Sequence, residues 1–196
     1  HGTPKLDSFE FVRTIAAADC GFGYRHSLFK SAAGRHVVLD VTFQLRLGSL
    51  SQPVAYADLA RQLGLELGER APLADARQAV LAQRRLRGMV LDREDHDTWS
   101  CGSFFTNPLL SEDAFAALTA RAAAAEVGEP PRFPTSDGQV KTSAAWLIER
   151  AGFGKGFGLP GPAALSTKHT LAVTNRGGAH AKDVLALARQ VRDGVH

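Results

Sequence analysis

Alternating apolar and polar residues give the clearest pattern in the chain, over residues 36–47 (HVVLDVTFQLRL). Successive side chains of a strand point to opposite faces, so this alternation predicts a half-buried strand. Its apolar face consists of Val37, Leu39, Val41, Phe43, Leu45 and Leu47. Its polar face, which would meet solvent or a ligand, consists of Asp40, Thr42, Gln44 and Arg46. Residues 9–15 (FEFVRTI) and 169–175 (HTLAVTN) predict two further strands.

Two long segments have a helical pattern instead. Residues 73–86 carry an apolar stripe and stop just before Gly88, a residue that favours helix ends. Residues 110–125 (LSEDAFAALTARAAAA) contain Ser111 as an N-cap, followed by two acids where the helix dipole favours negative charge. We therefore expect a helix in each segment.

The second half of the chain also contains helical patterns, separated by loop-forming segments. Residues 141–152 (KTSAAWLIERAG) predict a short helix, and apolar positions at i, i+3, i+4 and i+7 predict a helix over 184–191. A high content of Pro and Gly predicts loops at residues 128–138 and 152–162. Strands interleaved with helices indicate an α+β fold.

The composition limits the classes of function. At 196 residues, with 44% hydrophobic and 22% charged residues, the chain suits one domain or two small ones. Charged residues give way to turn-forming residues near Trp99, which predicts two domains, 1–98 and 99–196. A net charge of +3 is too small to indicate a nucleic-acid partner.

The cysteines and the apolar runs indicate a cytoplasmic location. Cys20 and Cys101 form no CxxC pair, so neither a disulfide framework nor a zinc site is predicted. No apolar run reaches the length of a membrane span, and no signal peptide is visible. The acidic residues 92–97 around His96 could be drawn as a metal site, but such runs are mostly solvated surface. We expect no metal and no membrane partner.

A glycine-rich stretch, residues 20–30 (CGFGYRHSLFK), is the first candidate for chemistry. Its glycines allow a close backbone approach to a ligand, and Arg25 offers a planar fork for a carboxylate or phosphate. A simple turn with a surface arginine is the favoured alternative on spacing alone.

Ser103, in residues 99–108 (WSCGSFFTNP), is the second candidate. There is no GxSxG motif and the nearest histidine in sequence is His96, so an acyl-transfer nucleophile is not expected. A serine can instead donate one proton if the resulting alkoxide is stabilised. The alternative is an ordinary turn residue beside core phenylalanines.

Basic residues supply the third candidate, a pocket for a diphosphate or carboxylate. They are Arg84, Arg85, Arg87, Lys141, Lys155 and Lys168. Ordinary solvated charge is the alternative. Residues 152–158 (GFGKGFG) lack the GxxxxGK[ST] order, so they are not a phosphate-binding P-loop.

The order of several blocks resembles one family, the UDP-N-acetylenolpyruvoylglucosamine reductases (MurB). The blocks are GFGYRHSLFK, the alternating strand, YADL, RLRGMVLD, GSFFTNP, VKTSAAWLIERAGFGKG and LSTKHTLAVTNRGG. The resemblance covers nearly the whole chain, and within the family the chain is similar to the actinobacterial members.

This resemblance implies a reductase that uses FAD and NADPH to convert UDP-N-acetylglucosamine enolpyruvate into UDP-N-acetylmuramate for peptidoglycan synthesis. Ser103 matches the serine that protonates the substrate, and Arg25 matches the arginine that stabilises the enolate. The matching substrate-binding positions are Tyr24, Tyr56, Arg87, Asn107 and, more weakly, Lys141.

For the fold, the resemblance implies part of an FAD-binding domain in residues 1–98, followed by a small α/β substrate-binding domain in residues 99–196. The family's glycine-rich flavin loop and its C-terminal strand with a catalytic glutamate have no counterpart in these residues. We therefore expect an incomplete reductase chain, and the alternative is a non-catalytic module that binds a UDP-sugar or nucleotide. The sequence predicts no oligomeric state.

Overall fold

A computed structural model describes residues 12–136 and 138–196, which divide into two compact units at Leu47 and Gly48. Unit 1 contains a 3-10 helix, η2 (Ala17–Cys20), and a single helical turn, α1 (Leu28–Ser31). Ser27 caps α1 by accepting the Lys30 amide. The strand predicted over residues 9–15 lies partly outside the described residues, and residues 12–15 are not in a strand.

The strand predicted over residues 36–47 is wrong, although its alternating pattern is clear. The structure gives this segment no secondary structure, and each of its six apolar side chains is more than half exposed. A strand persists only when its backbone groups pair with a neighbour. In the part of the chain that the structure describes, no strand pairs with this segment, so the pattern has no sheet to join.

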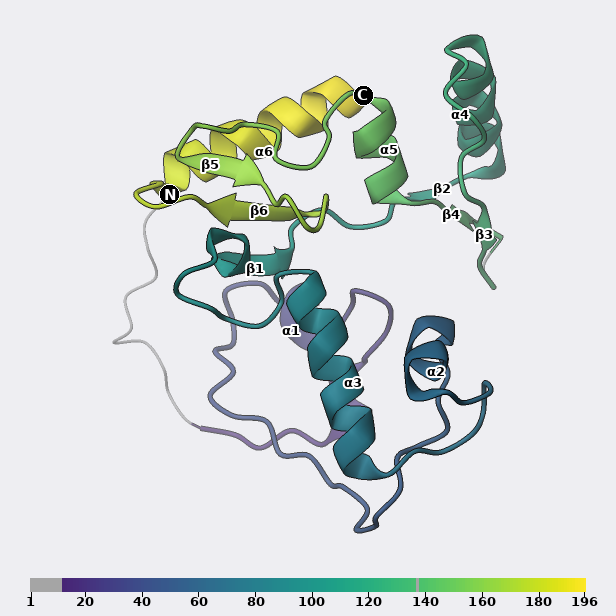
Figure 1. The fold of residues 1–196 in the computed structure, drawn as a ribbon, viewed down its shortest axis with the longest axis vertical. Helices are drawn as coiled ribbons and strands as arrows, with labels where there is room; N and C mark the ends of the chain where they lie inside the picture. Colours follow the sequence, from purple (N-terminus) through teal and green to yellow (C-terminus); the bar gives the residue numbers. More distant parts are fainter. Residues whose placement is uncertain (1–11, 137) are drawn as a thin grey trace. The chain divides into compact units, whose positions relative to one another are not determined.

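Unit 2 contains the remaining elements (Figure 1). Its helices are α2 (Ala57–Leu63), α3 (Leu73–Leu86), η3 (His96–Thr98), α4 (Glu112–Ala124), α5 (Ala144–Arg150) and α6 (Ala181–Val195). Its strands are β1 (Ser100–Ser103), β2 (Leu109–Leu110), β3 (Phe133–Pro134), β4 (Val140–Lys141), β5 (Ala163–Leu165) and β6 (Ala172–Asn175). Helices with small antiparallel sheets confirm the α+β prediction.

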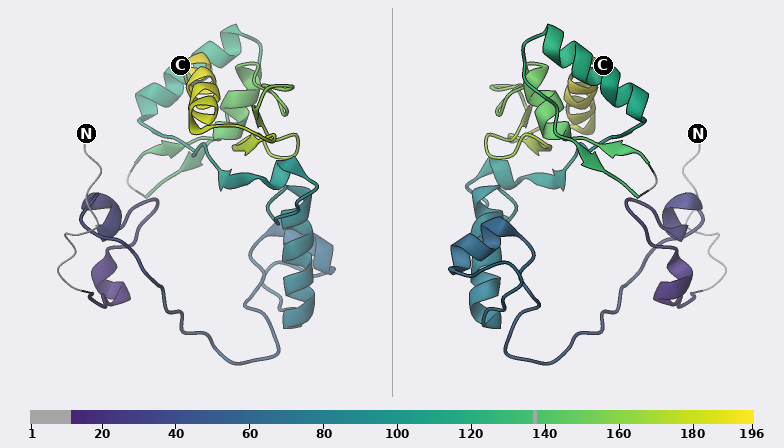
Figure 2. Two further views of the ribbon diagram at one scale, coloured as in Figure 1. Left: turned by 90° about the vertical axis from the view of Figure 1, so that its left-hand side faces the viewer. Right: turned by 90° about the vertical axis from the view of Figure 1, so that its right-hand side faces the viewer.

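The strands form two antiparallel sheets of three strands each. In the first, β6 lies between β1 and β5, with Leu165 opposite Val173. In the second, β4 lies between β2 and β3. Helix α6 packs on β5 and β6 of the first sheet and α5 packs on α6, in the fold that Figure 2 shows from two sides.

The hydrophobic core lies between the first sheet and helices α5 and α6. Leu165 from β5 and Val191 from α6 are fully buried, and Ile148 of α5 is almost so. Burial of each such side chain contributes roughly 1.5–3 kcal/mol to folding. This core fixes β6 and the turn that precedes it.

The four predicted helices are confirmed. Helix α3 has the predicted bounds, and the Ser111 side chain caps α4 by accepting the Ala114 amide. Helix α5 lies inside the predicted segment, and α6 extends beyond the predicted range at both ends. Strand β6 confirms the prediction for residues 169–175, whereas the predicted loop at 128–138 contains β3.

Among the helices of the described residues, none combines the length and the apolar character needed to cross a membrane.

Candidate active site

Ser103 is the last residue of β1, where the register against β6 is irregular. The next amide, that of Phe104, donates to Leu171 O at 2.7 Å, which holds the end of β1 against the chain entering β6. The exposed Ser103 Oγ lies 3.0 Å from Nε2 of His169, a residue 66 positions later in the sequence. The fold therefore builds a serine–histidine pair from two separate segments.

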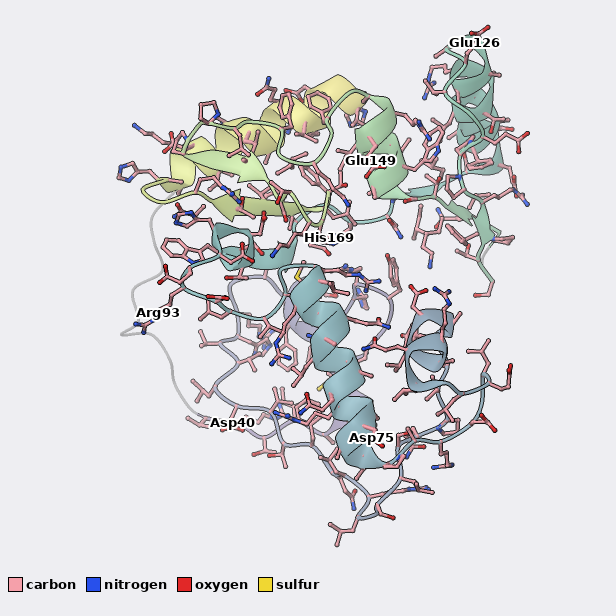
Figure 3. All side chains as sticks on the ribbon, in the orientation of Figure 1. Asp40, Asp75, Arg93, Glu126, Glu149 and His169 are labelled. Atoms are coloured by element: carbon pink, nitrogen blue, oxygen red, sulfur yellow. The ribbon has the colours of Figure 1, made fainter. Side chains whose placement is uncertain are left out.

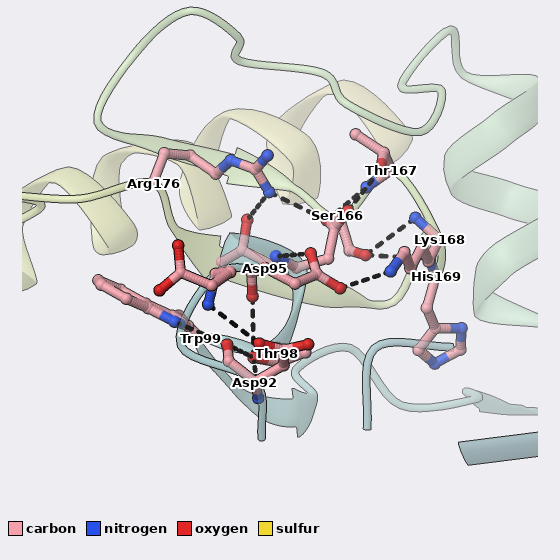
Figure 4. Close-up of polar contacts among 12 residues, drawn as sticks. Asp92, Asp95, Thr98, Trp99, Ser166, Thr167, Lys168, His169 and Arg176 are labelled. Carbon is pink, nitrogen blue, oxygen red and sulfur yellow. Dashed lines mark hydrogen bonds and ion pairs between the residues drawn. The ribbon is translucent and has the colours of Figure 1, made fainter. Parts of the chain in front are cut away.

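The turn between β5 and β6, residues 166–170, carries His169 and is anchored at several points (Figure 4). The buried Ser166 Oγ accepts the amides of Lys168 at 3.0 Å and of His169 at 3.1 Å. At the end of the turn, Thr170 Oγ1 donates to Glu149 Oε1 of α5 at 2.6 Å. The His169 ring points away from the anchoring contacts in Figure 4, so the turn is fixed and its imidazole is left to face Ser103.

Asp97 holds the other side of this turn. Its carboxylate accepts the Thr167 amide at 2.8 Å and the Thr167 hydroxyl, and it pairs with Arg176 at 3.0 Å. Burial acts to raise the pKa of Asp97, but the hydrogen bonds from Thr167 and Ser166 and the charge of Arg176 outweigh it and lower the pKa. The charged carboxylate is thus the stable form in the fold.

A second ion pair, between Lys168 and Asp95, lies on the more exposed side of the turn. The hydrogen bond from Lys168 lowers the pKa of Asp95 below its usual value, and the same bond raises the pKa of Lys168. Both groups stay charged near neutral pH, so this contact ties residue 168 to the segment before η3.

His169 is half-buried near the C-terminal end of α3 (Figure 3). Burial lowers the pKa of His169 below 6.5, and the positive charges of Arg87 and Lys155 lower it further. The imidazole is therefore neutral at pH 7 and can either donate or accept at Nε2. The effect of Arg87 also places that predicted residue in the electrostatic surroundings of the Ser103–His169 pair.

Arg87 follows α3 and is held in place from two sides. Its Nη2 lies 3.8 Å from Asp58 Oδ2 of α2. The next residue, Gly88, has φ +67° and packs so closely on η3 that a Cβ would come within 2.8 Å of Asp97 O. The end of α3 is thus fixed against both α2 and the segment that anchors the His169 turn.

A pocket of about 440 Å³ opens between α2 and α3. Its lining residues are Asp58, Arg61, Gln62, Gln83, Leu86 and Arg87. Tyr56, another predicted binding residue, is the N-cap residue of α2 and is 75% exposed. Arg61 and Arg87 both pair with the Asp58 carboxylate in this lining. Their remaining N–H groups and the two glutamine amides are donors of the kind that a phosphate group accepts from.

Asn107 and Lys141 lie around the start of α5. The Asn107 Oδ1 atom accepts the Ala144 amide at 3.0 Å, which satisfies one of the free N–H groups at that helix end. Its Nδ2 group is left as a donor. Lys141 is half-buried in β4, opposite Leu109 of β2 and Phe133 of β3.

Arg25 and Tyr24 belong to unit 1. Arg25 has φ +57°, the left-handed region that non-glycine residues seldom adopt, and its carbonyl accepts the Lys30 ammonium at 2.7 Å. Unusual backbone conformations of this kind concentrate at functional sites. Tyr24 is 56% exposed. The positions of Arg25 and Tyr24 are therefore described within unit 1.

His169 is the residue that sequence reasoning missed. His96 is the histidine nearest to Ser103 in sequence, whereas His169 lies 66 residues away. The signal that was present is the position of His169 inside the LSTKHTLAVTNRGG block, just before a predicted strand.

The described residues offer no group of three or more His, Cys, Asp or Glu side chains that could hold a metal ion. Within the glycine-rich residues 152–162, Gly158 and Gly161 pack closely on their own chain and leave no room for a flavin diphosphate at those positions. A Cβ at Gly158, for example, would lie 2.8 Å from Ala163 O. These two positions therefore do not fit a flavin diphosphate.

Comparison with known proteins gives consistent results. Residues 94–196 match the family described as UDP-N-acetylenolpyruvoylglucosamine reductase, C-terminal domain. Proteins named UDP-N-acetylenolpyruvoylglucosamine reductase are similar to the chain. The protein from Thermobifida fusca is 60% identical, with 94% of this chain and 52% of that protein covered. The protein from Streptomyces coelicolor is 58% identical, over 93% and 48%. The protein from Mycobacterium tuberculosis is 53% identical, over 94% and 51%.

The chain spans about half the length of the curated relatives it matches. The family match extends over more than half of the chain and includes Ser103, His169 and the anchored turn. The chain therefore belongs to the UDP-N-acetylenolpyruvoylglucosamine reductase family.

Proposed function

We propose that the protein is a cytoplasmic UDP-N-acetylmuramate dehydrogenase that reduces UDP-N-acetylglucosamine enolpyruvate to UDP-N-acetylmuramate in peptidoglycan synthesis. FAD, reduced by NADPH, would supply the hydride when it is bound. The family match and the name carried by the relatives support this reaction. The observation that carries the proposal is the hydrogen bond of Ser103 to His169, because it fixes a hydroxyl that can deliver a proton.

In this proposal, Ser103 is the catalytic acid. Hydride addition to the enolpyruvyl double bond creates negative charge on the substrate, and one carbon must then take up a proton. Ser103 Oγ–H gives its proton to that carbon, and solvent restores the proton to Oγ. Arg25 neutralises the charge on the substrate carboxylate, for which its guanidinium fork is suited.

Substrate binding falls to the other predicted residues. Arg87 and the pocket between α2 and α3 suit the diphosphate of a UDP-sugar, because arginine forks match phosphate oxygens. The free Nδ2 group of Asn107 would donate to the substrate, and Lys141 would add a positive charge nearby. Tyr24 and Tyr56, both exposed, would cover apolar parts of the substrate.

Substitution of Ser103 tests the proposed function. In a protein of the relatives' full length that carries this chain, Ser103→Ala should leave the reduction of FAD by NADPH nearly unchanged. Reduction of the enolpyruvyl substrate should slow by about a thousandfold, because the general acid is lost. Stopped-flow absorbance of the flavin measures both half-reactions separately.

Thr106→Ala is the matched control, because it removes another exposed hydroxyl three residues further along the chain. It should leave both half-reactions unchanged. Equal slowing of both half-reactions by Ser103→Ala would contradict a role as proton donor.

A binding module without catalysis is the second candidate, and the match of residues 94–196 to a C-terminal domain favours it for this chain alone. Titration of the chain with FAD and with UDP-N-acetylglucosamine distinguishes the reductase from the binding module. Binding of the UDP-sugar without FAD would support the module, whereas stoichiometric binding of FAD would support a complete reductase.

A further inference from the structure

We propose that His169 is a positioning residue for Ser103, in which the Nε2–H group donates to Ser103 Oγ and leaves the Ser103 O–H free to face the substrate. This inference rests on the proposed function, since it assigns a direction to the one hydrogen bond that Ser103 makes with another side chain. It adds to that function a residue whose role lies in the orientation of the proton donor.

The direction of this hydrogen bond decides what Ser103 can do. If Nε2 accepts, the serine proton is engaged with the imidazole and cannot be delivered to a substrate. If Nε2–H donates, the serine proton is free, and the same N–H group stabilises the alkoxide that remains after the transfer. In that step the Oγ–H bond breaks and a C–H bond forms on the substrate carbon, and the Nε2–H bond stays intact. A serine that acts as an acid therefore requires the Nε2–H tautomer.

The surroundings of His169 suit a neutral donor that does not move. The turn that carries it is held by Ser166 within, by Asp97 through Thr167, and by Glu149 through Thr170. The charges that act on the ring are the cations Arg87 and Lys155, and together with burial they keep its pKa low. In the part of the chain that the structure describes, no carboxylate hydrogen-bonds to the His169 ring or contributes to the shift of its pKa. The imidazole is thus fixed, neutral and directed at one atom.

Two substitutions of His169 separate hydrogen bonding from packing. His169→Gln keeps an N–H donor at the position of Nε2, whereas His169→Leu fills similar space without a donor. In the full-length protein we expect His169→Leu to slow reduction of the enolpyruvyl substrate by about a hundredfold, the usual effect of losing one donor to a developing anion. His169→Gln should retain most of the rate, and both variants should reduce FAD with NADPH at the normal rate.

Three results would overturn the role of His169. They are a normal rate in His169→Leu, equal losses in the two variants, and a loss that extends to flavin reduction. None of them depends on the Ser103→Ala result, so a failure of the proposed function is recognised separately. If Ser103→Ala leaves substrate reduction intact, it is the proton donor itself that is wrong.

The tautomer can also be measured in the chain without any substrate. Nitrogen-15 chemical shifts of the His169 ring at neutral pH distinguish Nε2–H from Nδ1–H, and His169→Gln identifies the signals. We expect the Nε2–H form, with a shift of the Nε2 signal in Ser103→Ala. A predominant Nδ1–H form would show that Nε2 accepts the serine proton, and the proposal would be wrong whatever the activity.

Discussion

Asp97 holds the His169 turn through a nearly buried carboxylate. Its side chain is only 5% exposed, yet it pairs with Arg176 and accepts two hydrogen bonds from Thr167. Breaking a buried ion pair at one partner leaves the other charge uncompensated, which costs about 3 kcal/mol or more. Loss of this one carboxylate charge would therefore weaken both the ion pair with Arg176 and the hydrogen bonds from Thr167.

We expect Asp97→Asn to lower the free energy of unfolding by about 3 kcal/mol, because the new amide N–H₂ group would face hydrogen-bond donors. Urea denaturation of the chain measures this change. Asp193→Asn is the control, since Asp193 also pairs with an arginine but is exposed, and its loss should stay below about 1 kcal/mol. Similar losses in the two variants would contradict the importance given to Asp97.

At the level of residues, sequence reasoning found Ser103 and missed the partner that orients it. Ser103 stands in a distinctive local block, and local patterns are visible in a sequence. His169 is joined to it by a strand pairing between β1 and β6, and the sequence does not reveal which strands pair. Asn107 shows a similar limit, because its contact with Ala144 depends on where α5 begins in space.

At the level of elements, the helical patterns were predictive, whereas the shortest strands could not be recognised in the sequence. Helices α3 and α4 have apolar stripes or capping residues that specify them locally. Strands β2, β3 and β4 have two residues each, too few for an alternation to be recognised. Residues 36–47 fail for the opposite reason, because a strong local pattern still needs a paired neighbour.

The start of α5 gives a test at this scale. Asn107→Ala should reduce the free energy of unfolding by about 1 kcal/mol, since it leaves the Ala144 amide without its side-chain acceptor. Asn107→Asp keeps an acceptor oxygen at the same place and should lose less. Thermal or urea denaturation of both variants measures the difference. Equal stability of Asn107→Ala and the unchanged chain would show that Asn107 does not support the helix.

At the level of the whole molecule, the two units differ in how they are held together. Unit 2 has both sheets, the longer helices and the buried cluster around Leu165, whereas unit 1 has two short helical segments. The units meet in sequence at residues 47 and 48, and the family match begins at residue 94. The predicted domain boundary between residues 98 and 99, and the assignment of residues 1–98 to a flavin domain, stay predictions.

The stability of the chain should fall in two separate steps as the pH is lowered. The pKa of His169 is below 6.5 in the folded state, so the unfolded chain binds this proton more readily and stability decreases as the pH falls from about 6.5 through the folded-state pKa. The pKa values of Asp95 and Asp97 are below 3.8, so the stability that these carboxylates contribute is lost only as the pH falls below about 3.8.

Urea denaturation at a series of pH values measures both steps. His169→Gln should remove the contribution of His169 between pH 6.5 and the folded-state pKa and leave the step below pH 3.8 in place. An upper step of the same size in His169→Gln would show that other groups cause it.

The exposed apolar face of residues 37–47 also bears on the fate of the polypeptide in a cell. Uncovered apolar side chains on an extended segment without secondary structure are a feature that chaperones and proteases recognise in incompletely folded proteins. A newly made chain whose apolar face stays uncovered is open to both aggregation and degradation. We therefore expect aggregation or proteolysis of the described residues to begin at this apolar face, and not at the packed core of unit 2.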